Sequence, residues 1–156
     1  MQDVNLYLRT SYHGLKSADG WYCSILEMPT QRGPVTLEVT NQEHGTANRI
    51  ALTGLLKALE RFSKPCALGI YTDSRHIEQG IGWLKEWKKV GWVTAKGEEI
   101  KNKDLWTRIN TELERHLVTV EYTEHTEYSA WQLNRMREEA RKHEQKVKGM
   151  QLQQQG

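Results

Sequence analysis

Apolar residues alternate with polar ones in the first third of the chain. In residues 34–40 they occupy every second position: Val35, Leu37 and Val39. A period of two places one kind of side chain on each face of a strand, so this segment predicts a half-buried strand. Two earlier apolar stretches, residues 4–8 and 21–28, predict two more strands. The loops between the three contain glycine, which favours an antiparallel meander.

The spacing becomes helical after residue 46. Between residues 47 and 62 the apolar positions recur every three or four residues: Ile50, Ala51, Leu55, Ala58, Leu59 and Phe62. This spacing predicts a helix, which Ser63-Lys64-Pro65 ends. Further periodicity predicts, in order, a strand, two helices, a strand and a charged helix over residues 67–72, 74–84, 103–116, 117–122 and 129–148. The order β-β-β-α-β-α-α-β-α is typical of an α/β domain.

The chain length of 156 residues suits one domain with a substantial core. No linker or internal repeat divides the sequence, so we expect residues 1–148 to form a single domain. Residues 149–156 are rich in glutamine and lack periodicity, and we expect this tail to be disordered.

Charge and cysteine content indicate the cellular compartment more than the function. The formal net charge is only +2, so only the placement of basic residues can indicate a nucleic-acid binder. Cys23 and Cys66 form no CxxC pair, which argues against a zinc site and favours reduced thiols in a cytoplasm. No signal-peptide pattern and no apolar run of about 18 residues occurs, so we expect a cytoplasmic protein without a membrane partner.

A series of recognisable sequence motifs begins in the middle of the chain. Residues 70–74 read Ile-Tyr-Thr-Asp-Ser, and a segment rich in tryptophan and lysine continues to Trp106. Upstream, residues 46–52 read Thr-Ala-Asn-Arg-Ile-Ala-Leu. Together these motifs resemble type 1 ribonuclease H, over about residues 4–141. The resemblance implies the ribonuclease H-like fold: a five-stranded mixed sheet whose first three strands are antiparallel and whose last two are parallel to the first.

The resemblance also implies an activity, hydrolysis of the RNA strand of RNA–DNA hybrids with two Mg²⁺ or Mn²⁺ ions. Two divalent cations held together need a dense set of carboxylate ligands. In this chain the first acid of the family falls at Arg9, the second at Ala51 and the third at Asp73. The fourth falls near Arg135 or Arg137, with Glu138 and Glu139 close by. We therefore expect the two-metal mechanism to be lost, with no metal site and no cofactor.

Two family positions of the catalytic site are retained, Asp73 and His125. The resemblance gives a histidine at position 125 a part in product release or proton transfer, although an exposed loop histidine without a role is an equal interpretation. Asp73 lies between a strand and a helix, where helix capping or ion pairing is favoured over catalysis. Because the implied fold makes strands one and four neighbours, we expect the Arg9 guanidinium to pair with Asp73.

A basic segment, residues 83–103, is called the handle below. It holds six lysines, three glutamates and three tryptophans. Lysines neutralise phosphates and exposed indoles stack on bases or sugars, and the resemblance implies contact with the DNA strand of a hybrid. We expect Trp87 and Trp106 to pack the handle against the domain. The candidate contacts with nucleic acid are Lys88, Lys89, Trp92, Trp83, Asn48 and Thr46, although Asn48 could simply cap a helix.

Three functions follow from these observations. The first is a catalytically inactive module that binds RNA–DNA hybrid or duplex nucleic acid. The second is an active nuclease with relocated acids, using Asp73 with Glu43, Glu127 or Glu138. The third is a protein-interaction domain that kept only the fold. Loss of the acids and retention of the basic handle favour the first, and the sequence indicates no particular protein partner.

Overall fold

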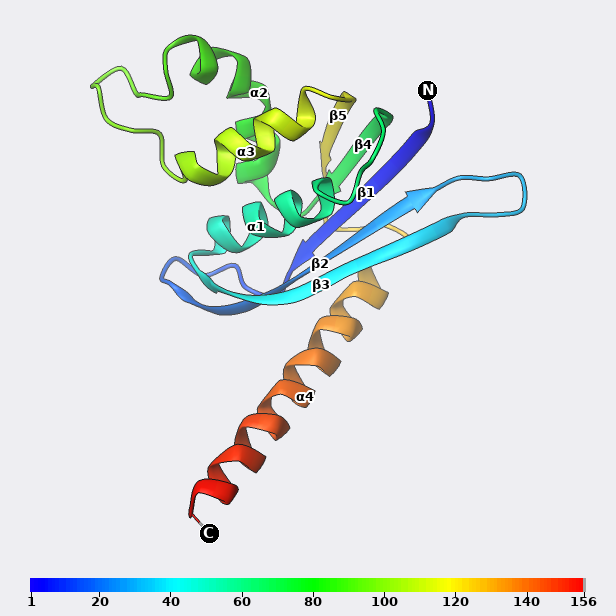
Figure 1. Cartoon of the computed structure of the whole chain (residues 1–156), viewed down its shortest axis with the longest axis vertical. Helices are drawn as coiled ribbons and strands as arrows, with labels where there is room; N and C mark the ends of the chain where they lie inside the picture. The colour runs from blue at the N-terminus through cyan, green and yellow to red at the C-terminus, as the bar shows by residue number, and fades with distance from the viewer. Residues whose placement is uncertain (156) are drawn as a thin grey trace.

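A computed structural model describes residues 1–155 and the side chains of residues 1–154. Five strands form one sheet in the order β3-β2-β1-β4-β5 (Figure 1). Their bounds are Asp3–Thr10 (β1), Ala18–Met28 (β2), Val35–Gly45 (β3), Ala67–Thr72 (β4) and Leu117–Tyr122 (β5). β1, β2 and β3 pair antiparallel, whereas β4 is parallel to both β1 and β5. The mixed sheet and the order of elements are as predicted.

Helices cover the two faces of the sheet unequally. On one face lie α1 (Ala47–Leu59), α2 (Arg75–Lys89) and α3 (Lys103–Leu113), and on the other lies α4 alone (Figure 1). The main core lies between the sheet and the first three helices. Gly54 lets α1 approach the sheet closely, because a Cβ there would lie 2.8 Å from Tyr22 Cβ and 2.9 Å from Leu8 Cδ1.

The second face has a smaller core under the first turns of α4 (Ser129–Gln155). Buried Gln132 lies at its centre, where its Nε2 donates to the carbonyls of Tyr7 at 3.0 Å and Cys23 at 2.8 Å. Farther along, α4 leaves the sheet and projects from the domain (Figure 1). Within residues 1–155 no helix is long and apolar enough to span a membrane.

Two predictions differ from the structure. The tail expected to be disordered continues α4 as helix through Gln155, because glutamine, methionine and leucine are all good helix formers; Gly156 lies outside the described residues. The strand expected to be half buried is open at its beginning, where Val35 is 60% and Leu37 39% exposed. Only Val39 packs against the core. A groove follows the first half of β3. The other side of this groove is lined by residues 61–66, the segment that follows α1.

The strand β5 is joined to β4 by a buried histidine. His116 Nδ1 accepts the Cys66 backbone N–H at 3.1 Å, and this role requires a neutral ring. Burial lowers the pKa of His116 below its ordinary value.

We predict that His116 makes the protein less stable in acid. Because its pKa is lower in the folded than in the unfolded chain, its contribution is complete above about pH 6.5, the unfolded value, and is lost as the pH falls below it. Urea unfolding between pH 8 and pH 5 measures this. His116→Asn retains an acceptor that does not titrate, so its unfolding free energy should fall less over this range. If the unfolding free energy of the two proteins fell equally with pH, His116 would not be the group responsible.

Candidate functional site

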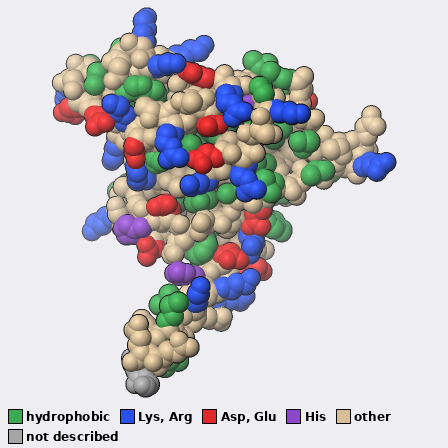
Figure 2. Space-filling view, in the orientation of Figure 1, with side chains coloured by type: hydrophobic (Ala, Val, Ile, Leu, Met, Phe, Trp, Pro, Cys, Tyr) green, Lys and Arg blue, Asp and Glu red, His purple; other side chains and the backbone are tan. Residues whose placement is uncertain are grey.

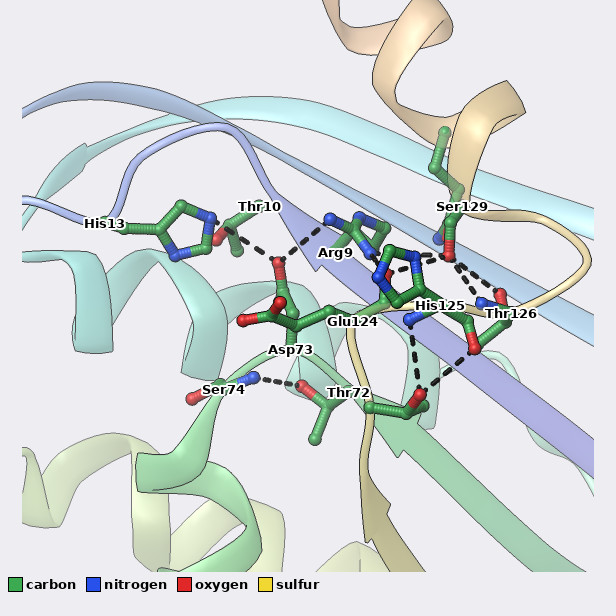
Figure 3. A network of polar contacts seen from close by, with 12 residues as sticks. Arg9, Thr10, His13, Thr72, Asp73, Ser74, Glu124, His125, Thr126 and Ser129 are labelled. Atoms are coloured by element: carbon green, nitrogen blue, oxygen red, sulfur yellow. Dashed lines mark hydrogen bonds and ion pairs between the residues drawn. The ribbon is translucent and has the colours of Figure 1, made fainter.

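The site forms where β1 and β4 end side by side. Their parallel register pairs Leu8 with Thr72, so the next residues, Arg9 and Asp73, lie level with each other. Arg9 Nη2 lies 4.0 Å from Asp73 Oδ2, and the Asp73 side chain is only 3% exposed (Figure 3). The expected ion pair is therefore present. The ion pair is a single, long contact rather than a bidentate one, because the other Nη atom of the guanidinium donates to different partners.

The same guanidinium holds the loop that follows β5. Arg9 Nη1 donates to the Glu124 carbonyl and to Ser129 Oγ, the latter at 3.3 Å (Figure 3). Ser129 Oγ in turn accepts the Thr126 backbone N–H at 2.7 Å. One side chain thus connects the ends of β1 and β4 to the start of α4.

A second side chain beside Asp73 was not predicted. His13, in the loop after β1, places Nε2 3.5 Å from Asp73 Oδ2 while remaining 60% exposed. Burial raises the pKa of the Asp73 carboxyl above its ordinary value, although His13 and Arg9 lower it. The only sequence signal for His13 is its position four residues after Arg9, and that signal does not reveal how the loop curls back.

Neither residue expected near the fourth acid position lies beside Asp73. Arg135 lies away from Asp73, with its Nε 2.8 Å from Glu38 Oε2 on β3, and Arg137 is exposed. The α4 residue that reaches the site is Ser129, because the loop after His125 is short and the first turn of α4 meets the end of β1. Ala51, at the second acid position that the resemblance implies, is buried, and its side chain has no oxygen or nitrogen atom that could ligate a metal.

The residues present do not fit two divalent metals. Of the residues that the resemblance places at the four acid positions, only Asp73 is a carboxylate, and a guanidinium and an imidazole lie beside it. Of the acids considered as replacements, Glu43 lies on β3, Glu127 accepts from Tyr7 Oη at 3.4 Å and Glu138 is exposed. Among residues 1–155, no three Asp, Glu, His or Cys side chains are grouped so as to hold a metal.

His125, which the resemblance makes the other retained family position, is exposed and lies in the loop before α4 (Figure 3). Its backbone N–H donates to Thr123 Oγ1 at 3.2 Å, and the Thr123 hydroxyl donates to its carbonyl at 3.0 Å. The loop backbone is therefore fixed locally while the imidazole stays open to solvent.

The three tryptophans of the handle and Trp106, which follows it, have different environments. Trp106 is fully buried and its ring centroid lies 5.5 Å from that of half-buried Trp87, so both pack the handle against the domain as predicted. Trp92 was expected to contact nucleic acid, but it is half buried, and its ring centroid lies 6.4 Å from that of Trp87. Gly91 and Trp92 both have positive φ, and this turn directs the indole inward. Trp83 is the exposed indole, at 57%.

The start of α1 is fastened to the handle. Thr46 caps the helix by accepting the Arg49 N–H at 3.2 Å, which leaves Asn48 exposed rather than capping. Arg49 forms a two-pronged pair with Asp104, at 3.1 and 2.6 Å, and also donates to Asn102. No sequence pattern predicts this contact, which places the exposed Asn48 on the same part of the surface as the end of the handle.

We predict that Arg9 is structurally required. Arg9→Met removes a cation from the buried Asp73 and a donor from the Glu124 carbonyl, so it should cost about 3 kcal/mol of unfolding free energy. The double variant Arg9→Met/Asp73→Asn has no unpaired buried charge and should recover about 1 kcal/mol or more. Urea unfolding of the wild type, both single variants and the double variant gives the coupling. Additive costs would show that the two charges do not interact.

Comparison with known proteins agrees with this fold. The RNase H family matches residues 1–140. The chain is 35% identical over 119 residues to ribonuclease HI of Xylella fastidiosa strain 9a5c, covering 76% of this chain and 77% of that protein. It is 42% identical over 117 residues to ribonuclease H of Bradyrhizobium diazoefficiens, covering 74% and 73%.

Solved structures show the same architecture. LC9-RNase H1, described as a type 1 RNase H with the type 2 active-site motif, superposes with a TM-score of 0.72 at 22% identity, over 85% of this chain and 69% of that one. The RNase H domain of PFV gives a TM-score of 0.60 at 17% identity, over 81% and 86%. The family match and the identity to these relatives show that the chain belongs to the ribonuclease H family.

Proposed function

We propose that this ribonuclease H-like protein does not hydrolyse RNA by the two-metal mechanism and instead binds RNA–DNA hybrid or duplex nucleic acid. The observation that carries the proposal is the placement of Arg9, a permanent cation at the first acid position of the family. Its partners are Asp73, Glu124 and Ser129.

Electrostatics supports the loss of catalysis. Two divalent cations would bring four positive charges to the end of β1, where Arg9 already supplies one and His13 lies close by. A buried Asp73 can offset about one of these charges, and neither Ala51 nor Ser129 adds another. Repulsion between like charges at such short range outweighs what a single carboxylate offers.

The handle supports nucleic-acid binding. Within the described residues, four of its lysines form no ion pair: Lys85, Lys89, Lys96 and Lys101. Lys88 pairs with Glu114 at 2.7 Å and remains more than half exposed, so it can exchange that partner for a phosphate. Lys and Arg side chains are spread over the end of the molecule formed by α2 and α3 (Figure 2). Exposed Trp83 adds a surface for stacking.

The names of the relatives agree with this choice of ligand, since they are ribonucleases H. We further propose that residues 1–148 act as one domain and that the protein is cytoplasmic. Cys23 and Cys66 are both free and buried, as suits a reducing compartment.

We predict no cleavage of a labelled RNA–DNA hybrid above the no-protein background at millimolar Mg²⁺ or Mn²⁺. Arg9→Asp alone should not restore activity, because positions 51 and 129 still lack a carboxylate. The triple variant Arg9→Asp/Ala51→Glu/Ser129→Asp rebuilds a four-acid set with Asp73 and, where circular dichroism shows it folded, is the matched test for gain of cleavage. Metal-dependent cleavage by the wild type that Asp73→Asn abolishes would refute the proposal.

We predict salt-sensitive binding of the same hybrid through the handle. Lys88→Ala/Lys89→Ala should weaken binding and reduce the slope of log Kd against log salt by nearly two, since each phosphate contact contributes about 0.9. Fluorescence anisotropy from 50 to 200 mM KCl measures this. Lys146→Ala/Lys148→Ala makes the same change in net charge on the projecting part of α4 and should leave the slope unchanged. Absence of binding to hybrid and duplex at low salt would favour the protein-interaction function instead.

A further inference from the structure

The outer edge of β3 has no pairing strand within the part of the chain that the structure describes. β3 is eleven residues long, and its register with β2 runs without a break from Met28↔Val35 to Ala18↔Gly45. Edge strands are commonly protected by lysine, proline or a bulge. Residues 35–42 contain none of these, and their one charge, Glu38, is neutralised by Arg135 at 2.8 Å.

The direction of each backbone group follows from one hydrogen bond. Ser11 N donates to the Trp21 carbonyl, so the odd-numbered residues of β2 face β1 and the even-numbered ones face β3. The β2–β3 register then turns odd-numbered residues of β3 toward β2. The N–H and C=O groups of Thr36, Glu38 and Thr40 therefore point away from the sheet and are available to another strand.

The side chains along this edge are self-complementary. Val35, Leu37 and Val39 lie on the α1 face, with Leu37 at the centre, so the pattern reads the same in both directions. On the same face is a groove of about 470 Å³, whose apolar lining includes Val4, Leu26, Met28, Phe62 and Pro65. Figure 2 shows hydrophobic side chains on the surface beside the projecting β2–β3 hairpin. The exposed apolar edge is thus continuous with an open apolar surface.

We infer that β3 pairs antiparallel with β3 of a second copy of this chain, across a two-fold axis at Leu37, and that the two sheets join into one of ten strands. In this register Val35 faces Val39 of the other copy. Thr36 and Glu38 of opposite copies exchange backbone hydrogen bonds, as the outward direction of their N–H groups requires.

Neighbouring registers are less favourable. An axis at Glu38 would place two glutamates directly opposite each other, which is destabilising. An axis at Thr36 would place Val39 opposite Gly33, outside the strand. Only the axis at Leu37 pairs all three apolar residues with apolar partners, and this match favours a second copy over an unrelated strand.

Cysteine cross-linking tests the register. Leu37→Cys places two thiols across the axis in a non-hydrogen-bonded pair with Cα atoms about 4.5 Å apart, within the range of a disulfide. The matched control Val35→Cys leaves its two thiols roughly 14 Å apart. Native Cys23 and Cys66 are buried and do not compete. We expect mild oxidation to give a covalent dimer for Leu37→Cys and not for Val35→Cys. Equal cross-linking of both would overturn the inference.

Sedimentation equilibrium tests the association itself, with the wild type expected to approach twice its chain mass of 18.2 kDa as concentration rises. Thr36→Pro removes an outward N–H without breaking a β2–β3 hydrogen bond, and symmetry doubles the loss. The dimer Kd should rise about tenfold or more, whereas Thr36→Ala, which keeps the N–H, should change it little. A wild type that stays monomeric at millimolar concentration would overturn the inference, as would a folded Thr36→Pro with unchanged Kd.

Discussion

The contacts of the Arg9 guanidinium hold together the ends of β1 and β4 and the start of α4. Parallel pairing of β1 with β4 brings Arg9 level with Asp73, and the length of the arginine side chain carries its guanidinium on to Glu124 and Ser129. In a metal-dependent relative this region would need room for two cations and their open coordination positions. Here protein atoms connect the three elements directly, so the link between them does not depend on a bound ion.

The elements of the fold were predictable because each has a clear period and a clear end. Ser74 begins α2 by accepting the Ile77 N–H, and the residues around Pro65 separate α1 from β4, as their sequences indicate. Errors arose where a pattern has two physical outcomes. Alternation at Val35 and Leu37 describes one face of a strand, but it does not say whether a helix covers that face. The residues after position 148 lack an apolar stripe, so their pattern does not predict the helix that they form.

The site was predictable only in the part that regular structure positions. Arg9 and Asp73 are at the ends of neighbouring strands, so their pairing follows from topology alone. The positions of His13, Ser129 and the Arg49–Asp104 pair depend on the conformation of loops. The periodicity of apolar residues does not predict that conformation. Trp92 shows the same limit, because its inward direction comes from a left-handed turn at residues 91 and 92. A tryptophan among lysines is equally consistent with packing and with binding until that turn is known.

Under the proposed function, the engagement of Arg9 also decides which residues can supply the binding energy for a nucleic acid. Its Nη atoms are directed at Asp73, Glu124 and Ser129, so a phosphate could gain Arg9 only by displacing these partners, of which Asp73 is a buried charge. Lysines of the handle carry no such cost, because their charges are already in water and most lack an ion-pair partner within residues 1–155. Affinity would then follow counterion release at the handle and the start of α1. Arg9 and its partners would contribute by holding β1, β4 and α4 in place, so that these two surfaces stay fixed relative to each other.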